Sequence, residues 1–524
     1  MELPLTPVDF LRRARKLHPK REAVVDGDVR LDYAEFGARC DRWAVALRGL
    51  GIGPGDRVAT IAANSRQHLE QFYAIPLLGA VIVPLNYRLT GDDFAYLVGH
   101  SGATVVCVDA EHLEAVDKVR EHMPDVRHFV TLEGARPGWL AYEDLLAAAS
   151  DSGFGPTPVA EGDLLAINYT SGTTSRPKGV MITHRNAWLN SANVLMHWPL
   201  AAGDRYLWTL PMFHANGWTF TWTVTAVGAT HVCLRQVNPA SVYDAVRRER
   251  ITHLCAAPTV LIGIANGPEA QRAALPRGVR IITAGAAPAA ATIERVEGEL
   301  GWNVTQAYGL TETSPFISYC EARPEHAGLP AAAAAAIKAR QGVELVGSGE
   351  LRVVDEAMND VPADGATLGE VIARGNAIMR GYYRDAEATS LAMRGGWFHS
   401  GDAAVLHPDG YIEIRDRYKD VIISGGENIS SIEVESALLG HPAVQEAAVV
   451  GMPHPQWGES PVAFVVLRAG QSTDEAALRQ YARSVLAHFK VPSAFHFVAE
   501  LPKTATGKIQ KFVLRGGRSA VTRQ

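Results

Sequence analysis

Short β-branched runs alternate with helix-forming stretches along most of the chain. Residues 57–61 and 103–108 are apolar runs of strand length, whereas residues 33–50 are rich in alanine and leucine. The run at residues 278–283 ends in Ala284-Gly-Ala-Ala-Pro before another helical stretch. Alternating strands and helices form parallel sheets, and ligands bind where such strands end. The pattern predicts an α/β fold with mainly parallel sheets.

The pattern changes near Gly349. Strand-like runs at residues 350–355, 369–374 and 410–415 are separated by Asp-Gly turns, which predicts a small antiparallel β-region. After Asp420 the chain has the pattern of a compact α+β unit.

This last unit includes a predicted helix that begins at Ser472-Thr-Asp-Glu475, a capping-box sequence. Its apolar positions, Leu478, Ala482, Val485 and Phe489, are expected to share one buried face. A separate run of alanines, residues 331–336, predicts a helix without chemistry.

Length and charge narrow the class of protein. With 524 residues, of which 47% are apolar, the chain is long enough for at least two domains. Lys and Arg number 50 against 56 Asp and Glu, and there is no basic block to neutralise a run of phosphates. These counts argue against nucleic acid as a partner.

The longest apolar stretch, residues 72–85, predicts a buried helix-to-strand segment. It is interrupted by Pro76, Gly79 and Pro84, and it falls short of the roughly 20 residues needed to cross a bilayer. No integral membrane segment is therefore expected. The N-terminus lacks the apolar region of a secretory signal.

The number and spacing of the cysteines indicate the cellular compartment. There are five, which is an odd number, and they are widely scattered, with no CxxC pair and no histidine cluster at metal-binding spacing. This usage fits a reducing cytoplasm, the expected location of the protein.

The most informative segment is residues 167–180, where a strand runs into a loop rich in hydroxyls, glycine and lysine. Backbone N–H groups, hydroxyl donors and one ammonium can surround the oxygens of a polyphosphate. The spacing from Gly172 to Lys178 excludes a Walker A loop. For a generic loop of this composition, a solvated turn is the alternative.

The string Thr170-Ser-Gly-Thr-Thr-Ser-Arg-Pro-Lys-Gly179 resembles the signature loop of the acyl-adenylate-forming (ANL) superfamily. That superfamily includes acyl-CoA synthetases, peptide-synthetase adenylation domains and firefly luciferase. Further motifs follow in the family's order: Tyr308-Gly-Leu-Thr-Glu312, Ser400-Gly-Asp402, Arg415-Asp-Arg417-Tyr-Lys419-Asp420, Ser424-Gly-Gly-Glu-Asn-Ile429 and Thr504-Ala-Thr-Gly-Lys508. The main departure is Ser400, where threonine is commoner.

The resemblance implies two domains. Residues 1–418 would form the large N-terminal domain that holds ATP and the acid, and residues 419–524 a small mobile domain. Lys419 stands at the family's hinge position. The fold class expected is therefore α/β, with mainly parallel sheets, helices and a small β-region, followed by an α+β domain.

The resemblance also implies the catalytic groups. Lys508 would reach the carboxylate and the α-phosphate, with Thr170, Lys178 and Glu312 as further catalytic residues. Thr170 and Glu312 would hold Mg²⁺, a hard cation that prefers oxygen ligands. The ATP- and AMP-binding set is Thr170, Ser171, Gly172, Thr173, Thr174, Lys178, Gly285, Ala286, Ala287, Tyr308, Gly309, Thr311, Glu312, Asp402, Arg417 and Lys508.

Within this set, Tyr308 and the Gly285 strand end would flank the adenine. Asp402 would accept hydrogen bonds from the ribose, and Arg417 would support that contact. Outside the motifs, Asp402 is as readily explained as an ordinary turn residue.

Two further sites follow from the resemblance. Gly425 and Gly426 would line a passage for coenzyme A, with Trp457 near its nucleotide, although a buried structural tryptophan is the alternative for Trp457. His214 and Trp218 would line an apolar acyl pocket that continues through residues 220–222. No basic residue in that cluster pairs with a second carboxylate, so a hydrophobic monocarboxylic acid is expected.

The predicted function is an ATP-dependent acyl-CoA ligase that forms acyl-AMP and pyrophosphate and then acyl-CoA. The resemblance is closest to medium- or long-chain fatty acyl-CoA synthetases and methylmercaptopropionate-CoA ligases, which implies a possible homodimer. Two alternatives stay open: an acyl-AMP ligase that donates to a carrier protein in trans, and a non-catalytic nucleotide- or acyl-binding protein. The sequence does not identify the acid.

Overall fold

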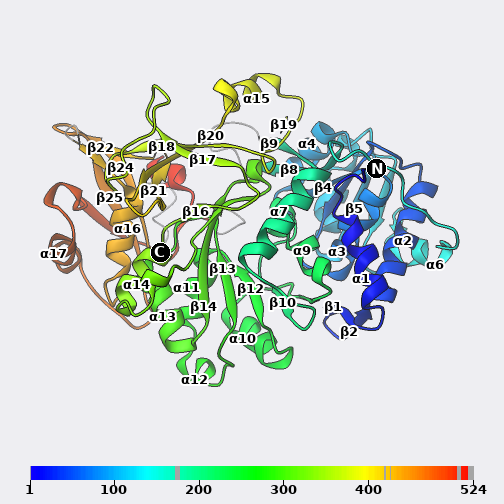
Figure 1. The fold of residues 1–524 in the computed structure, drawn as a ribbon, viewed down its shortest axis with the longest axis horizontal. Helices are drawn as coiled ribbons and strands as arrows, with labels where there is room; N and C mark the ends of the chain where they lie inside the picture. The colour runs from blue at the N-terminus through cyan, green and yellow to red at the C-terminus, as the bar shows by residue number, and fades with distance from the viewer. Residues whose placement is uncertain (1, 171–176, 418–419, 425–426, 504–508, 517–524) are drawn as a thin grey trace.

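The structure, a computed structural model, describes residues 2–170, 177–417, 420–424, 427–503 and 509–516. Within these residues the chain forms four β-sheets of nine, eight, four and five strands. The two largest sheets and their helices make up most of the molecule (Figure 1).

The nine-stranded sheet has the order β16-β15-β14-β13-β12-β10-β11-β1-β2. Neighbours from β14 to β1 run parallel, and β2, β15 and β16 add antiparallel edges. The bounds are β1 (Glu22–Asp26), β2 (Val29–Asp32), β10 (Arg205–Trp208), β11 (Thr230–Cys233), β12 (His253–Ala256), β13 (Arg280–Thr283), β14 (Asn303–Gly309), β15 (Phe316–Tyr319) and β16 (Val343–Glu344).

The eight-stranded sheet has the order β19-β9-β8-β4-β3-β5-β6-β7. From β8 to β7 the neighbours are parallel, whereas β9 and β19 are antiparallel additions. The bounds are β3 (Arg57–Ile61), β4 (Val81–Leu85), β5 (Val105–Val108), β6 (His128–Thr131), β7 (Leu140–Ala141), β8 (Leu164–Thr170), β9 (Lys178–Thr183) and β19 (Gly381–Tyr382).

Helices cover both faces of both sheets. One apolar cluster joins the facing sides of the two sheets through α2 (Tyr33–Gly49), α3 (Arg66–Leu77), α7 (His184–His197) and α9 (Phe220–Val227). The outer faces are covered by α10 (Pro239–Arg248), α11 (Pro258–Asn266) and α13 (Ala290–Arg295) on one sheet, and by α4 (Gly91–Ser101) and α5 (Leu113–Asp117) on the other. The predicted α/β class with mainly parallel sheets is confirmed.

The predicted antiparallel region is a four-stranded sheet with the order β17-β18-β20-β21. Its strands are β17 (Glu350–Val354), β18 (Gly369–Arg374), β20 (Phe398–Leu406) and β21 (Ile412–Arg417). Because β20 carries Asp402 and β21 ends at Arg417, this sheet places two of the predicted ribose-binding residues side by side.

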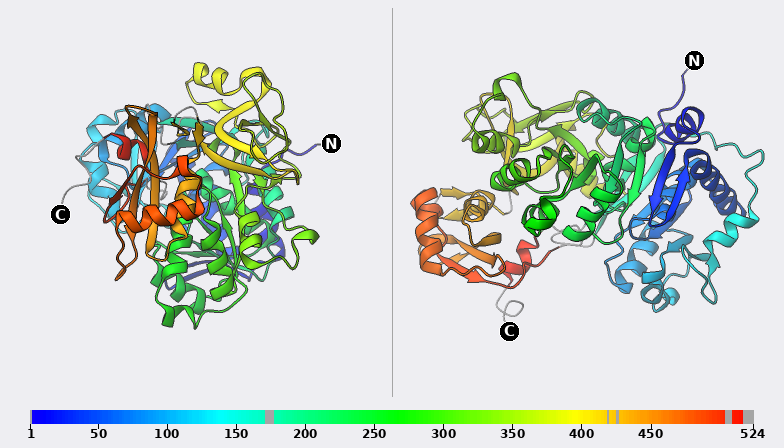
Figure 2. Two further views of the ribbon diagram at one scale, coloured as in Figure 1. Left: turned by 90° about the vertical axis from the view of Figure 1, so that its left-hand side faces the viewer. Right: turned by 90° about the horizontal axis from the view of Figure 1, so that it is seen from below.

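The C-terminal unit has its own sheet and core, separate from the layered sheets. Figure 2 shows it beside the larger unit, in orange and red. Its elements are β22 (Ile422–Ser424), β23 (Glu427–Ile429), β24 (Val444–His454), β25 (Gly458–Leu467), β26 (Ala494–Phe497), α16 (Ser431–Leu439), α17 (Glu475–Val485) and α18 (Lys511–Arg515). The predicted boundary at residues 418 and 419 falls between β21 and β22, outside the described residues.

Helix α17 differs from its prediction at both ends. Its N-cap is Asp474, whose carboxylate accepts from the backbone N–H of Ala477 at 2.8 Å, rather than Ser472. Leu478 and Ala482 are buried as expected, but Val485 and Phe489 are 51% and 43% exposed. The helix ends at Val485 and a 3₁₀ turn (His488–Lys490) follows, so the helical pattern does not extend to Phe489.

The predicted helix-to-strand segment at residues 72–85 is confirmed, since it runs from α3 into β4 and is buried throughout. Within the described part of the chain, none of the helices has both the length and the apolarity that crossing a membrane requires. The remaining helices are α1 (Val8–Leu17), α6 (Tyr142–Ala148), α8 (Ala215–Trp218), α12 (Glu269–Arg272), α14 (Ala331–Lys338), which contains the alanine run, and α15 (Ala386–Ala392).

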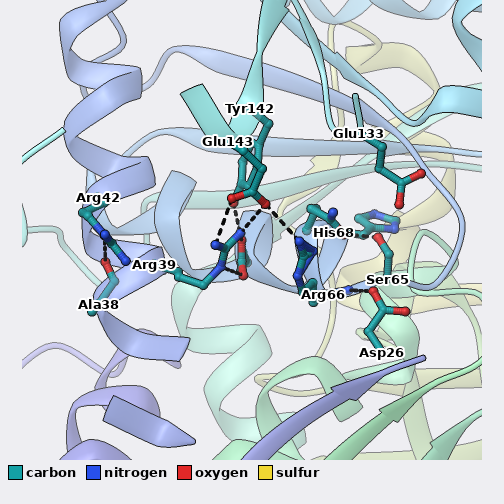
Figure 3. A network of polar contacts seen from close by, with 12 residues as sticks. Asp26, Ala38, Arg39, Arg42, Ser65, Arg66, His68, Glu133, Tyr142 and Glu143 are labelled. Atoms are coloured by element: carbon teal, nitrogen blue, oxygen red, sulfur yellow. Dashed lines mark hydrogen bonds and ion pairs between the residues drawn. The ribbon is translucent and has the colours of Figure 1, made fainter. Parts of the chain in front are cut away.

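A polar network joins α2, α3 and α6 (Figure 3). The Glu70 side chain is fully buried on α3, where Arg39 Nε approaches its Oε1 at 2.6 Å and the Tyr142 hydroxyl donates to Oε2. Arg39 also contacts Glu143 at 2.7 Å, and Arg66 contacts the same carboxylate at 3.0 Å. Both oxygens of the buried Glu70 carboxylate therefore have donors.

Glu70→Ala is expected to lower the free energy of unfolding by about 3 kcal/mol, because it leaves Arg39 and the Tyr142 hydroxyl without their buried acceptor. Glu143→Ala is the matched control, since the Glu143 side chain is 46% exposed and its pairs should contribute at most about 1 kcal/mol. Urea unfolding followed by circular dichroism measures both. Equal losses for the two variants would contradict the importance of burial at Glu70.

Candidate active site

The predicted phosphate loop joins two antiparallel strands, β8 and β9. Thr170 ends β8 and pairs with Lys178, the first residue of β9. Gly179 is required beside them, because a Cβ there would lie 2.9 Å from Ile167 and 3.3 Å from Tyr169. The hairpin therefore holds Thr170 and Lys178 opposite each other at the two ends of the loop.

Tyr308, Asp402 and Arg417 form one hydrogen-bonded group. The Tyr308 hydroxyl donates to Asp402 Oδ2 at 2.6 Å, and Arg417 Nε contacts Asp402 Oδ1 at 2.7 Å. Arg417 also donates to the Ser400 carbonyl at 3.0 Å, and the Ser400 hydroxyl accepts from the Asp402 backbone N–H. The structure thus brings together three residues from three separate motifs.

The electrostatics of this group keep its protonation fixed. Burial, reinforced by the negative charge of Asp402, raises the pKa of the Tyr308 hydroxyl well above its usual range. Burial opposes the charge on Arg417, but the surrounding acidic groups together, Asp402 foremost, outweigh burial and raise the pKa of Arg417. Tyr308 therefore stays a hydrogen-bond donor and Arg417 stays charged at neutral pH.

Two parallel strands end beside this group. After β13, Gly285 adopts a left-handed φ of 88°, and Gly285 and Ala286 are exposed while Ala287 is half-buried. At the end of the neighbouring β14, a Cβ on Gly309 would lie 1.8 Å from the Pro315 carbonyl oxygen, so only glycine fits. The residues predicted to flank the adenine therefore lie at the ends of two neighbouring parallel strands, one of which carries Tyr308.

The predicted acyl segment has a strained backbone. Five consecutive residues, Ala215 to Thr219, have φ between 45° and 66°, a left-handed conformation that costs about 1–2 kcal/mol for each non-glycine residue. Buried side chains hold the turn in place. Asn168, on β8, donates to the Asn216 side chain at 3.1 Å and to the Phe213 carbonyl, and Thr221 donates to the Asn216 carbonyl.

The left-handed turn presents Trp218 to the strand ends. The Trp218 indole lies 3.7 Å from the position of a Cβ on Gly285, and its ring packs edge-on against Phe316 at 5.6 Å between centroids. His214 directly precedes the turn. Phe220 and Trp222, which were expected to extend the pocket, instead pack in the core against Tyr206 and Phe72.

A small apolar cavity lies behind Phe316. Its volume is about 10 Å³, room for about one water molecule. It is lined by Val194, His197, Trp198, Ile282, Ala307, Phe316, Tyr319 and Leu345. Phe316 therefore contacts both this cavity and the Trp218 indole.

Comparison with known proteins identifies the family to which the chain belongs. The family model described as "AMP-binding enzyme" matches residues 11–383, and the model described as "AMP-binding enzyme C-terminal domain" matches residues 433–508. The chain belongs to the AMP-binding enzyme family. The predicted superfamily and the enzyme class, an AMP-forming carboxylate–CoA ligase, are confirmed.

Relatives of this AMP-binding enzyme match over nearly their whole length. The chain is 43% identical to "Acetate--CoA ligase CCL3" of Humulus lupulus and 42% identical to "Acetate/butyrate--CoA ligase AAE7, peroxisomal" of Arabidopsis thaliana, in each case over 98% of this chain and 94% of the relative. A crystal structure of the anthranilate CoA ligase AuaEII with anthranoyl-AMP superposes with a TM-score of 0.90 at 27% identity, covering 98% of both chains.

Glu312 and Thr170 fit a magnesium ion by the chemistry of their donors, a carboxylate and a hydroxyl. Glu312 lies in a 3₁₀ turn (Thr311–Thr313) that packs against β9. One of its oxygens, Oε1, accepts from the Tyr382 hydroxyl at 2.8 Å. The AMP-binding enzyme thus places an oriented carboxylate beside the strand that begins with Lys178.

Trp457 is 48% exposed, so the alternative of a buried structural tryptophan is wrong. It stacks on His454 and precedes Gly458, which pairs with Ser424 on β22. Trp457 therefore lies one residue from the Ser424–Gly458 pair.

Several predicted residues lie outside the described residues of this AMP-binding enzyme. They are Ser171, Gly172, Thr173, Thr174, Lys419, Gly425, Gly426 and Lys508.

The sequence prediction missed Tyr382, which contacts both Glu312 and Lys178. The only local signal is a Gly381-Tyr-Tyr triplet, which does not reveal that its strand pairs with β9 some 200 residues earlier.

Proposed function

We propose that this CoA ligase activates a short apolar monocarboxylic acid. The observation that carries the proposal is the Trp218 indole, which packs against Phe316 and lies 3.7 Å from the position of a Cβ on Gly285, so that a large side chain fills the space beside the strand ends. The predicted acyl segment, residues 211–222, contains no Lys or Arg to pair with a second carboxylate. Relatives named for acetate and butyrate support the same size. The proposal keeps the expected hydrophobic monocarboxylic acid and replaces the medium- or long-chain resemblance with a short acid.

In the first half-reaction a carboxylate oxygen attacks the α-phosphorus of ATP, and pyrophosphate leaves. Lys178 and Lys508 stabilise the negative charge that develops on the phosphoryl oxygens. Asp402 accepts from the ribose hydroxyls while Arg417 and Tyr308 fix its position. Glu312 and Thr170 would hold Mg²⁺, which would supply positive charge to neutralise the triphosphate.

In the second half-reaction the thiol sulfur of CoA attacks the acyl carbonyl, and AMP leaves. We assign residues 1–418 and 419–524 to two domains that rotate about Lys419 between the half-reactions. Gly425 and Gly426 would then border the passage of the pantetheine arm. Exposed Trp457 offers its indole face to the CoA nucleotide.

Location and assembly stay predictions. A cytoplasmic location was expected from the sequence, whereas several matched relatives carry "peroxisomal" in their names. The homodimer is likewise a prediction. The five cysteines are buried and unpaired, so none is placed for an intermolecular disulfide.

Pyrophosphate release tests the proposed function. A panel of straight-chain, branched, aromatic and thioether acids is supplied with Mg·ATP, with and without CoA. We expect the fastest release with short apolar acids and acyl-CoA formation when CoA is present. Release without a CoA-dependent thioester would favour a carrier protein as acceptor. If none of the acids in the panel caused pyrophosphate release, the proposed function would be refuted.

Trp218→Gly should shift the preference toward longer acids. Removing the indole opens the space between Gly285 and Phe316, and each methylene accommodated is worth roughly 1–3 kcal/mol. We expect the ratio of kcat/KM for hexanoate over butyrate to rise at least about tenfold. Trp222→Phe, at a fully buried core position, is the control and should leave the ratio unchanged. An unchanged ratio in Trp218→Gly would show that Trp218 does not line the acyl pocket.

A further inference from the structure

One short segment, Met379 to Tyr382, connects the phosphate hairpin to the turn that carries Glu312. The Met379 backbone N–H donates to the Glu312 carbonyl at 2.7 Å, which fixes the backbone of that residue. Three residues later, the Tyr382 hydroxyl donates to the Glu312 carboxylate at 2.8 Å. Both the backbone and the side chain of Glu312 are thus held by the same segment.

The same segment is bound to the strand that begins with Lys178. Tyr382 pairs with Val180 and Gly381 with Met181, in antiparallel register. Backbone hydrogen bonds from Arg380 to Met181 at 3.0 Å and from Tyr383 to Gly179 at 2.7 Å extend that pairing. As a result the Tyr382 ring lies 4.9 Å, from ring centroid to Nζ, beneath the Lys178 ammonium.

Tyr382 therefore contacts two groups of opposite charge that both act on the triphosphate. Its hydroxyl is a neutral donor to the carboxylate, and its ring face attracts the ammonium through the aromatic quadrupole.

We propose that Tyr382 is a positioning residue that orients Glu312 toward magnesium and Lys178 toward the phosphates of ATP. The inference rests on the proposed function, because it takes Glu312 as the metal-binding carboxylate. With Oε1 held by Tyr382, the carboxylate cannot rotate freely, so Oε2 is presented in one direction. A tyrosine serves both groups, because phenylalanine lacks the donor and a short polar residue lacks the ring.

The alternative is that Tyr382 only stabilises the fold. The backbone N–H of Tyr382 has such a structural role, because it donates to the Thr389 hydroxyl at 2.9 Å and connects β19 to α15. Substitutions that keep this backbone bond and change only the side chain separate the two roles. Tyr382→Phe removes the hydroxyl alone, and Tyr382→Leu removes the ring as well.

The experiment measures ATP binding to the full-length enzyme by isothermal titration calorimetry, without acid, in EDTA and in excess Mg²⁺. For Tyr382→Phe we expect the gain in ATP affinity on adding Mg²⁺ to shrink about tenfold, since a hydrogen bond to a charged group is lost, while affinity in EDTA is unchanged. For Tyr382→Leu we also expect the ATP affinity in EDTA to fall about threefold, because the Lys178 ammonium loses its contact with the ring. The Mg²⁺ concentration for half-maximal pyrophosphate release should rise in parallel.

Tyr383→Phe is the matched control. The Tyr383 ring lies against His100, at 6.0 Å between centroids, and has no contact with Glu312 among the described interactions. Wild-type magnesium coupling in Tyr382→Phe would overturn the proposal, as would equal losses in Tyr382→Phe and Tyr383→Phe. Pyrophosphate release by the wild-type enzyme checks the proposed function separately. A wild-type enzyme that couples ATP to Mg²⁺ but releases no pyrophosphate would refute the function and leave the role of Tyr382 intact.

Discussion

Lys508→Ala is expected to slow adenylate formation by about 10²- to 10³-fold, the range seen when one group that stabilises developing oxyanion charge is removed. The reason is electrostatic. Attack of the carboxylate on the α-phosphorus builds negative charge on the phosphoryl oxygens, and we propose that Lys508 of the Thr504-x-x-Gly507-Lys508 motif supplies a cation there. Pyrophosphate release with a short acid measures the loss.

The second half-reaction provides the control for Lys508. When synthetic acyl-AMP and CoA are supplied, Lys508→Ala should form acyl-CoA at close to the wild-type rate, because the thiol attack does not use this lysine. Lys511→Ala is unsuitable as a comparison, since Lys511 forms a buried ion pair with Glu435. Arg483, near the end of α17, offers an alternative control site. Equal loss of both half-reactions would contradict a role limited to adenylation.

Asp402→Asn is expected to raise the KM for ATP by about 10²-fold with a much smaller change in kcat. The substitution removes the negative charge that we propose accepts from the ribose, and a hydrogen bond to a charged group is worth about 1.5–3 kcal/mol. It also weakens the contact with Arg417, now 2.7 Å, that fixes the carboxylate. Because these contacts bind nucleotide in the ground state as well as in the transition state, the loss appears in KM.

Asp360→Asn is the matched control for Asp402. Asp360 also pairs with an arginine, Arg352 at 2.7 Å, but its side chain is 64% exposed and lies away from the motifs. Steady-state kinetics and calorimetric ATP binding measure both variants. If Asp402→Asn lowered thermal stability without weakening ATP binding, Asp402 would be a structural residue of the β20–β21 pair.

The sequence predicted the family and the general form of the fold because both depend on local patterns. The apolar runs at residues 57–61 and 103–108 have strand length, and they became β3 and β5. The antiparallel region after Gly349 was predicted from its Asp-Gly turns, which act over a few residues. The ordered motifs supplied the functional class.

Other features depend on contacts between distant parts of the chain. The contact of Tyr382 with Glu312 spans 70 residues, and no periodic pattern records it. The full burial of Glu70 follows from its place between α2 and α6, not from its neighbours in α3. The left-handed turn before Phe220 is also unpredictable from local preference, because that preference opposes it.

By itself, the sequence determined the class of chemistry, since hydroxyls, glycines, carboxylates and lysines in a fixed order can bind only a limited range of ligands. The tertiary structure decided which of those groups touch: Asp402 with Tyr308 and Arg417, Glu312 with Tyr382, and Trp218 with Phe316. The physical reason is range. Propensity and periodicity act within a few residues, whereas pocket size and side-chain orientation arise from packing between strands that are far apart in the chain.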